Sequence, residues 1–425
     1  MTKYFLRALM VFIVVFSVIG VASSRDLSGR VIDAETHAAI GGATLTVGDH
    51  AIMTDDAGRF DIKEAVGVLR VRSPGYSRKE IGPNELGESP IEIRLSPFLP
   101  KALYLSFYGI GSTALRNAAL RLIREAQLNA VVIDVKGDRG LVAYRSSVPL
   151  AAAVGAQRII TIPNLPGLLR TLRQDGLYTI ARIVVFKDDP LANARPDLAV
   201  RRLDGGIFRD REGLRWVDPT RREVWDYNIA IAAEAAEAGF DEIQFDYLRF
   251  PDSKEIRFPV PNTQEARIKA ITGFIDAARA RLVPYNVFLA VDVFGYICWN
   301  LDDTHIGQRL EDILPRVDYL SPMLYPSGFQ FGIPGYPNPV AHIYEIVHRS
   351  LERIRVRTHV SPRRIRPWLQ AFRDYAFDRR QFGAYEIRQQ IRAAEDFGTD
   401  GWMLWNPRNV YSDQGLVAKT AAACW

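Results

Sequence analysis

Three aspartates stand near the ends of apolar runs that are typical of buried strands. Asp134 lies in Val-Val-Ile-Asp-Val-Lys, Asp246 in Glu-Ile-Gln-Phe-Asp-Tyr-Leu-Arg-Phe-Pro, and Asp292 in Leu-Ala-Val-Asp-Val-Phe-Gly. Two carboxyl groups on either side of a bond supply a proton donor and a nucleophile, which is what glycoside hydrolysis requires. We therefore take Asp246 as the candidate nucleophile, Asp292 as the candidate general acid and base, and Asp134 as the reserve catalytic candidate.

Basic, amide and aromatic side chains near the same strand ends are suited to bind a sugar. Guanidinium and amide groups bind hydroxyls or an acidic sugar, and aromatic rings stack on sugar faces. The expected substrate-binding residues are Lys136, Arg182, Trp216, Tyr247, Arg249, Tyr325, Gln370, Trp405 and Asn406, with Tyr108 and Trp299 as further aromatic candidates.

The alternation of side chains along a strand predicts which way these residues face. Residues two apart share a face, which groups Asp134 with Lys136, Gln244 with Asp246, and Ala290 with Asp292. The apolar residues between them are expected to pack against helices, so the charges should face inward. A buried charge is costly unless it is paired, and Lys136, Arg182 and Arg249 are the expected partners. In the alternative reading, Asp134, Lys136 and Arg182 form a buried ion network with no role in chemistry.

The elements that must position these residues alternate between apolar strands and helical runs after Pro100. Expected strands are 102–108, 130–136, 178–186, 242–249, 287–294, 319–325, 364–372 and 401–406, and helical runs include 113–127, 221–238, 264–282 and 384–397. Eight strand–helix units predict an α/β fold, a (β/α)₈ TIM barrel over residues 101–425. In that fold the active site lies at the carboxyl ends of the strands, which is where the candidate residues fall.

Residues 27–96 have a different pattern, with short alternating strands separated by polar turns. Strands at about ten-residue spacing predict a small β-sandwich. The elements Thr-Asp-Asp-Ala-Gly-Arg-Phe at 54–60 and Pro-Gly-Tyr at 74–76 resemble the carboxypeptidase regulatory-like domain, which has a prealbumin-like fold. The resemblance implies a module without chemistry of its own, a spacer or a carbohydrate-proximal domain.

The barrel segment resembles a family assigned to the glycoside hydrolases, the DUF4015 group. The resemblance rests on VVIDVKGDRG at 131–140, ARIVVFKDDPLA at 181–192, WVDPTRREVWDYN at 216–228, GFDEIQFDYLRFP at 239–251, VDVFG at 291–295 and SPMLYPS at 321–327. It spans the whole barrel and implies a TIM-barrel glycosidase that acts on a polysaccharide or oligosaccharide. Its catalytic residues follow only by analogy with other barrels.

Composition and charge limit the other partners. The formal charge of the 425 residues is +5, and removing Lys3 and Arg7 with an export signal leaves +3, so no nucleic acid is expected as a partner. Residues 1–24 combine those two charges with the apolar run 8–21 and small residues at 22–24, which predicts a signal peptide and a periplasmic or extracellular location. An uncleaved N-terminal membrane anchor is the alternative. Cys298 and Cys424 are the only cysteines of the sequence, and in an oxidising compartment they could form one disulfide.

Three other classes of protein compete with the glycosidase. Gly-Ile-Gly-Ser-Thr-Ala at 109–114 matches the dinucleotide-binding pattern G-x-G-x-x-A, with Asp134 ending the next strand. A metal-dependent deacetylase is disfavoured because none of the six histidines ends a strand. A barrel that only binds glycans uses the same mouth and is the main alternative. We expect no cofactor and no metal.

The first prediction concerns export. Because a basic start, an apolar run and small residues occur in that order, we expect cleavage near residues 23–24. N-terminal sequencing of the mature protein from the extracytoplasmic fraction checks this. A cytosolic protein that retains Met1 would contradict it.

Overall fold

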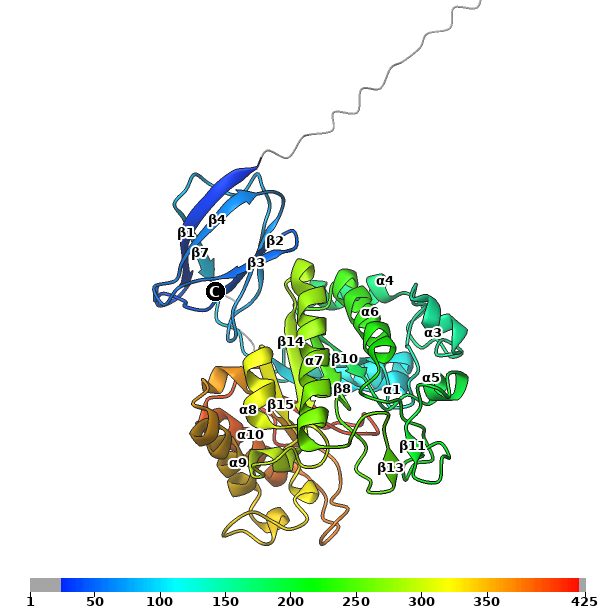
Figure 1. Cartoon of the computed structure of the whole chain (residues 1–425). Coiled ribbons are helices and arrows are strands. Elements are labelled where there is room, and N and C mark those ends of the chain that lie inside the picture. Colours follow the sequence, from blue (N-terminus) through cyan, green and yellow to red (C-terminus); the bar gives the residue numbers. More distant parts are fainter. Residues whose placement is uncertain (1–23, 420–425) are drawn as a thin grey trace, which may run out of the picture.

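A computed structural model describes residues 24–419, which form a small β domain followed by a larger α/β barrel (Figure 1). The predicted signal peptide therefore lies outside the described residues, apart from Ser24. Within the described part of the chain, no helix has the length and apolar character needed to cross a membrane.

Eight parallel strands form the barrel. They are β8 (Lys101–Leu105), β9 (Ala130–Lys136), β10 (Tyr178–Val184), β12 (Glu242–Asp246), β14 (Phe288–Val293), β15 (Tyr319–Pro322), β16 (Trp368–Gln370) and β17 (Trp402–Trp405). Hydrogen bonding joins them in the order β15-β14-β12-β10-β9-β8-β17-β16. Parallel bridges from Leu320 to Ile365 and from Met323 to Trp368 connect the two end strands and close the ring. The predicted (β/α)₈ barrel is confirmed.

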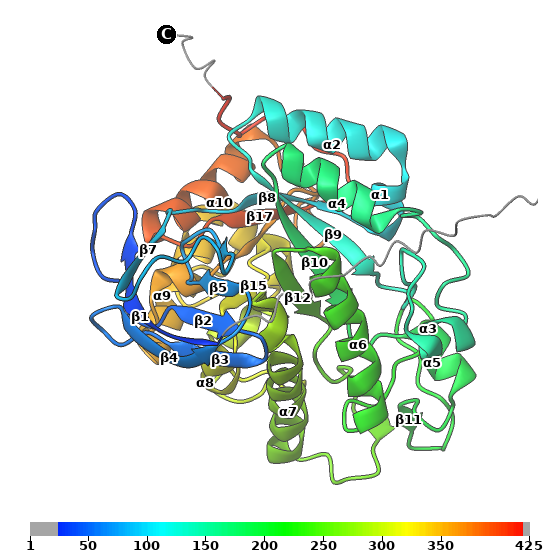
Figure 2. The same ribbon diagram turned by 90° about the horizontal axis from the view of Figure 1, so that it is seen from above.

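Helices surround this ring (Figure 2). The longer ones are α2 (Thr113–Glu125), α4 (Leu165–Gln174), α6 (Arg222–Ala238), α7 (Gln264–Leu282), α9 (Ile343–Thr358) and α10 (Ala384–Phe397), and the shorter ones are α1 (Phe107–Gly111), α3 (Pro149–Ala153), α5 (Asp189–Ala194) and α8 (Leu310–Ile313). Side-chain oxygens of Ser112 and Thr263 cap the amino ends of α2 and α7. Gly239 and Gly398 end α6 and α10 in the left-handed conformation that glycine adopts without strain.

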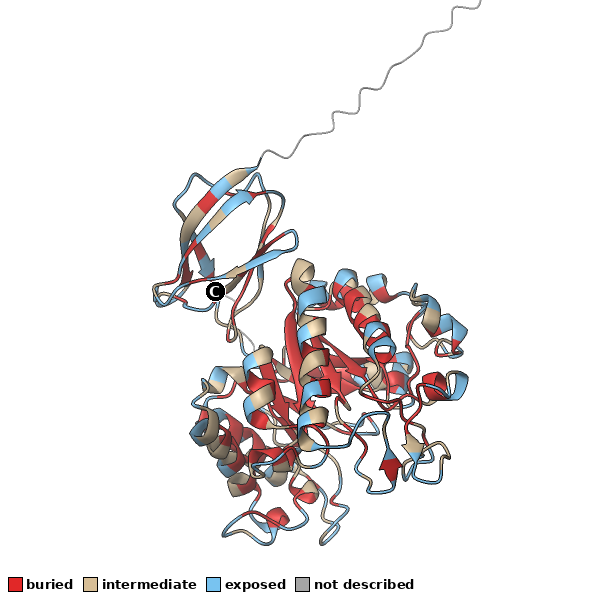
Figure 3. Cartoon of the chain, in the orientation of Figure 1, coloured by how far each residue is buried: buried red, intermediate tan, exposed pale blue. Residues whose placement is uncertain are grey.

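The barrel has two apolar layers that follow from strand alternation. On β9, Val131, Ile133 and Val135 pack in the cluster that includes the helices, while Ala130 and Val132 belong to the cluster inside the ring. The strands are accordingly buried along nearly their whole length (Figure 3). Residues at even positions of β10, and of β9 as far as Asp134, therefore project into the barrel.

Several strands are shorter than their apolar runs predicted, whereas α7 and α10 have the expected bounds. The run 242–249 continues to Arg249, but β12 ends at Asp246 because Tyr247 turns the backbone into the left-handed region at φ 48°. Two short strands, β11 (Arg201–Arg202) and β13 (Ile256–Arg257), pair in the loops that follow β10 and β12.

The glycine-rich pattern at 109–114 does not form a dinucleotide site in this fold. Gly109 and Gly111 lie in α1, and a Cβ atom at Gly109 would be 1.8 Å from Asn409 Oδ1. Close packing therefore explains the glycine at 109, and the Rossmann interpretation is wrong.

The small domain is a two-sheet β-sandwich, as the short strands predicted. One sheet contains β1 (Arg25–Asp33), β4 (Arg59–Ala65) and β7 (Ile91–Leu95), and the other contains β2 (Thr44–Val47), β3 (His50–Met53), β5 (Leu69–Arg72) and β6 (Lys79–Ile81). Leu27, Ile93, Leu45 and Val71 from both sheets share one core. The resemblance of this domain to the carboxypeptidase regulatory-like family stays a prediction.

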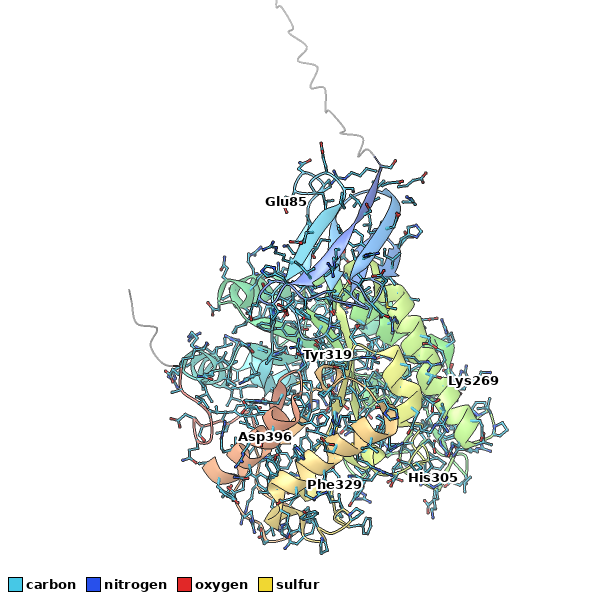
Figure 4. The ribbon with its side chains drawn as sticks, turned by 90° about the vertical axis from the view of Figure 1, so that its left-hand side faces the viewer. Glu85, Lys269, His305, Tyr319, Phe329 and Asp396 are labelled. Carbon is cyan, nitrogen blue, oxygen red and sulfur yellow. The ribbon has the colours of Figure 1, made fainter. Side chains whose placement is uncertain are left out.

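This sandwich docks at the amino-terminal end of the barrel strands. Arg72 pairs with Asp318, just before β15, and with Asn286, before β14. Arg78 bonds Asp241, just before β12, and the Gly75 amide donates to Tyr319 Oη on β15. Figure 4 shows Tyr319 at the end of the barrel nearer the sandwich, with Phe329 and His305 at the far end. The carboxyl ends of the strands stay open.

The predicted disulfide cannot be followed to its second cysteine, because Cys424 lies outside the described residues. Cys298 is buried, and burial raises the pKa of its thiol to about 12. The pairing stays a prediction.

The docking contacts generate a second prediction. Replacing Arg72 by Ala leaves Asp318, whose side chain is 12% exposed, without its ion-pair partner. We expect the free energy of unfolding to fall by about 3 kcal/mol, as measured by urea denaturation.

Arg94→Ala is the matched control, because its ion pair with Glu92 is at least half exposed on both sides. That change should cost less than about 1 kcal/mol. Equal losses in the two variants would show that the docking ion pair adds nothing to stability.

Candidate active site

A single buried arginine organises the mouth of the barrel. Arg182 on β10 is 1% exposed and lies within ion-pair distance of four aspartates. Its Nη1 lies 2.7 Å from Asp134 Oδ1 and its Nη2 lies 2.9 Å from Asp138 Oδ1. Its Nε lies 2.9 Å from Asp246 Oδ2 and 4.0 Å from Asp292 Oδ2.

Strand register brings these groups together. Arg182 lies beside Asp134 on β9 and beside Gln244 on β12. Asp246 is therefore two residues closer than Arg182 to the carboxyl end of the strands. Asp292 comes from β14, the next strand after β12 in the ring. These side chains point inward because Val132, Ile180 and Ala290, two positions before Asp134, Arg182 and Asp292, belong to the cluster inside the ring. On β12, Ile243 and Phe245 pack in the outer cluster, so Gln244 and Asp246 take the inner face.

One guanidinium cannot neutralise four carboxylates, so protons must be held at this site. Burial raises the pKa of Asp292 well above its usual value, the Asp246 charge raises it further, and Arg182 opposes both. Asp292 Oδ1 accepts a 2.7 Å hydrogen bond from Trp368 Nε1, while Oδ2 has no hydrogen-bond partner among residues 24–419. The geometry suits a protonated acid with its second oxygen free.

The other two inward aspartates have different surroundings. Asp246 accepts from Arg182 Nε and Nη2 at Oδ2 and from the Tyr247 amide at Oδ1, and these donors suit a carboxylate. The backbone of Tyr247 is left-handed, a local strain of the kind found at functional sites. Burial raises the pKa of Asp134 to about 6, against the opposing effects of Arg182 and Tyr104.

Asp246 and Asp292 share one cavity. Arg182 Nε lies 2.9 Å from Asp246 Oδ2 and 4.0 Å from Asp292 Oδ2, so these two oxygens are no more than about 7 Å apart. This limit allows the carboxyl separation of about 5–5.5 Å that retaining glycosidases have. The cavity of about 220 Å³ is lined by Arg182, Asp246, Tyr247, Arg249, Asp292, Phe294, Gln308, Met323, Tyr325, Trp368 and Trp405.

Two further cavities adjoin it. One, of about 210 Å³, contains Asp134, Asp138 and Tyr108 and shares Trp405 with the central cavity. The other, of about 440 Å³, contains Lys187 and Trp216 and shares Tyr247 and Arg249 with it. We call this second one the Trp216 cavity. The three form one cleft across the carboxyl ends of the strands, with the paired aspartates at its centre.

Most of the predicted site residues line this cleft. They are Asp134, Asp246, Asp292, Arg182, Trp216, Tyr247, Arg249, Tyr325 and Trp405. Other side chains already cover part of the Trp405 ring. The Tyr104 ring stacks on it with the two centroids 3.9 Å apart, and the guanidinium carbon of Arg182 lies 4.8 Å from its centroid. Trp299 lies outside the cleft, where its indole donates to Ser350.

Lys136 does not face the mouth, contrary to its predicted place. The register of β9 on β10 shifts after Arg182, so that Ile183 pairs with Lys136 and Val135 is an extra residue. The Lys136 ammonium binds Asp188 at 2.7 Å, Asn228 on α6 and the Val184 carbonyl. It is fully buried and cannot contact a substrate in the cleft.

Gln370 and Asn406 were also predicted to bind substrate, but the structure places neither of them in the cleft. The amide of Gln370 is fully engaged by Ser327 and the Phe372 carbonyl. The amide of Asn406 donates to the carbonyls of Ala371 and Val410. Both residues hold loops at the mouth and do not line the cleft. Arg249 was expected to pair with an aspartate, but it contacts aromatic rings.

Three residues of the site escaped sequence reasoning. Tyr104 on β8 donates to Asp134 at 2.8 Å, Trp368 on β16 donates to Asp292, and Asp138 binds Arg182 from the turn after β9. The first two have inward positions that alternation could have indicated. Asp138 lies in Lys-Gly-Asp-Arg-Gly, where the turn gives no hint of direction.

Comparison with known proteins identifies the barrel. Residues 102–411 match the model of the family DUF4015, described as "Putative glycosyl hydrolase domain". The chain belongs to this family. No curated protein matches the sequence.

Two solved structures share the barrel fold with this chain, and a third is similar in sequence over part of it. The glycoside hydrolase domain of PgaB (BpsB) from Bordetella bronchiseptica aligns with a TM-score of 0.51 at 15% identity, over 74% of this chain and 95% of that one. Alpha-L-fucosidase isoenzyme 2 from Paenibacillus thiaminolyticus aligns with a TM-score of 0.50 at 13% identity, over 74% and 47%. A hypothetical protein from Ruminiclostridium thermocellum is 38% identical over 45% of this chain and 97% of its own, with a TM-score of 0.40.

The raised pKa of Asp292 generates a third prediction, on stability. Above about pH 4 the unfolded chain releases this proton while the folded protein keeps it, so this group makes stability fall as pH rises, by up to about 1.4 kcal/mol per unit. The asparagine of Asp292→Asn does not titrate, so the variant lacks this loss of stability. Its stability relative to the wild type should therefore increase from pH 4 to pH 7 in denaturant titrations.

Asp56→Asn is the control, since this carboxyl is exposed on a turn of the small domain. Its stability difference from the wild type should not change with pH. A constant difference for Asp292→Asn as well would mean that Asp292 is ionised in the folded protein.

Proposed function

We propose that this protein is an extracytoplasmic enzyme that hydrolyses glycosidic bonds of a polysaccharide with two carboxyl groups, Asp292 as general acid and Asp246 as nucleophile. The observation that carries the proposal is the difference between these two neighbours. Asp292 is buried with a raised pKa and one free oxygen, whereas Asp246 is held by a guanidinium and a backbone amide in the same cavity. Such a division between two carboxyl groups suits acid and nucleophile.

The proposed reaction has two steps. Asp292 gives its proton to the leaving oxygen while Asp246 attacks the anomeric carbon, so the glycosidic bond breaks and an ester to Asp246 forms. Asp292, now ionised, then removes a proton from water, which attacks the same carbon and releases Asp246. Arg182 stabilises the carboxylate of Asp246 when it leaves.

The surroundings support a sugar as the substrate. Tyr247, Tyr325 and Trp405 present partly exposed rings in the central cavity, and sugars bind to such rings through their apolar faces. The side cavities extend the cleft on both sides, which provides room for a chain of sugars. We assign Asp134 a supporting place, because it holds Arg182 and Tyr104.

The export segment and the small domain complete the proposal. Residues 1–24 direct the chain out of the cytoplasm, and residues 27–96 form a separate unit attached to the catalytic unit at 101–425. The sandwich binds the end of the barrel opposite the cleft, where Arg72 and Arg78 make their ion pairs. This placement supports a structural role without direct contact to the bond that is cleaved.

The fourth prediction tests the two carboxyl groups. A screen of extracellular and cell-wall polysaccharides, read by release of reducing ends, first provides a substrate. Asp246→Asn should then keep the fold and sugar binding but lose several orders of magnitude in kcat, because the covalent step is lost. Asp292→Asn should impair substrates with poor leaving groups more than activated aryl glycosides, which need no protonation.

Asp400→Asn is the matched control, a buried aspartate at the other end of the barrel that pairs with buried Arg366. It should lower the melting temperature and leave the activity of the folded fraction intact. The same behaviour in Asp246→Asn would assign Asp246 a structural role. Glycan binding without hydrolysis by the wild type would make the barrel a binding protein.

A further inference from the structure

Arg249 is a guanidinium in the cleft without a carboxylate. It follows β12 and lines both the central cavity and the Trp216 cavity. Its guanidinium carbon lies 5.0 Å from the Trp216 ring centroid and 5.3 Å from that of Tyr247. Its Nη1 donates to the Phe250 carbonyl at 3.1 Å, and over residues 24–419 no carboxylate lies within 4.0 Å of it.

Three arginines of the barrel that are more deeply buried than Arg249 are paired with carboxylates. Arg182 binds four aspartates, Arg366 binds Glu242 and Asp400, and Arg267 binds Asp303. Arg249 is half-buried, and burial lowers its pKa against the opposing effects of Tyr247 and of the more distant carboxylates Asp246, Asp252 and Asp210. The two rings compensate in part through cation–π contacts and fix its plane. Its remaining N–H groups are left for a ligand.

The charges around Arg249 favour an anion. Lys187 in the Trp216 cavity is occupied by Asp210 at 3.5 Å and Glu212 at 3.0 Å, and these three groups together carry one negative charge. Arg209 and Arg211 also line this cavity and are exposed, while Asp252 is the remaining acidic group there. With Arg249 counted, the lining of the Trp216 cavity has four basic and three acidic side chains, which leaves an excess of one positive charge beside the aspartate pair.

We propose that the substrate is an acidic polysaccharide and that Arg249 binds the carboxylate of a uronic acid unit next to the bond that is cleaved. The planar fork of a guanidinium matches a carboxylate through two parallel hydrogen bonds. Arg182 cannot serve this purpose, because its donors are already taken by aspartates. This inference rests on the proposed function for the position of the cleaved bond.

The test compares acidic ligands with their neutral counterparts. Oligogalacturonate, oligomannuronate and oligoglucuronate, each with its carboxyl-reduced form, are titrated by calorimetry into the full-length Asp292→Asn protein, which should not turn them over. At least one acidic oligosaccharide should bind more than about tenfold more tightly than its reduced form. Adding Arg249→Met should remove that preference, and Arg249→Lys should keep part of it because the charge remains without the fork.

Arg222→Met is the matched control, because Arg222 lies 5.0 Å from the Trp225 ring but outside the cleft. It should leave the preference unchanged. The proposal is overturned if the reduced forms bind as tightly, if none of the oligosaccharides binds, or if the preference survives Arg249→Met. Should Arg249→Met fail to fold, an undiminished preference in Arg249→Lys has the same meaning.

Failure of the proposed function would be seen separately. Hydrolysis that is unaffected by Asp292→Asn would refute the catalytic assignment. An acidic preference that depends on Arg249 could still be measured in that protein.

Discussion

The ion cluster around Arg182 is the constraint on which the site depends. Four carboxyl groups converge on one buried guanidinium, and three of them are themselves buried, so ionisation of those three would leave an uncompensated negative charge away from water. The contacts of the guanidinium are unequal: Asp246 receives two of the N–H groups and Asp292 receives none at hydrogen-bond distance. Burial and the Asp246 charge raise the pKa of Asp292, and Arg182 opposes them. An unequal sharing of one cation thus creates two chemically different carboxyl groups.

At the opposite end of the barrel, a buried arginine and two carboxylates form an ion cluster that supports the fold. Arg366 is fully buried, binds Glu242 and Asp400, and stacks on Tyr319 with its guanidinium 3.9 Å from the ring centroid. The sandwich covers this end, and Tyr319 itself accepts a bond from Gly75 of the small domain. Because cover and ion pairs close one end, the open cleft is confined to the carboxyl ends of the strands.

Periodicity was sufficient to predict the fold and much of the cleft, because buried parallel strands and amphipathic helices have distinct patterns. Inward positions for Asp134, Arg182, Asp246 and Asp292 follow from alternation within single strands. Alternation fails where the backbone departs from a regular strand. The extra residue at Val135 diverts Lys136 toward α6, and Gln370 is used by a loop that is distant in sequence. Neither the bulge at Val135 nor the contact between Gln370 and its loop can be predicted from the neighbouring residues in the sequence.

Arg182 and Arg249 differ in their contacts, and these contacts decide which of the two guanidinium groups is available to a ligand. Both arginines lie on or just after strands that end in the mouth, and both have aromatic neighbours, so the sequence makes them equivalent. Arg182 has enough carboxylates to satisfy its fork, which makes it a fixed part of the protein. Arg249 has rings on its faces and one carbonyl on its edge, so its charge is free to act on a ligand. If the barrel binds an acidic polysaccharide as proposed, its specificity depends on the cation that the protein leaves without a paired carboxylate.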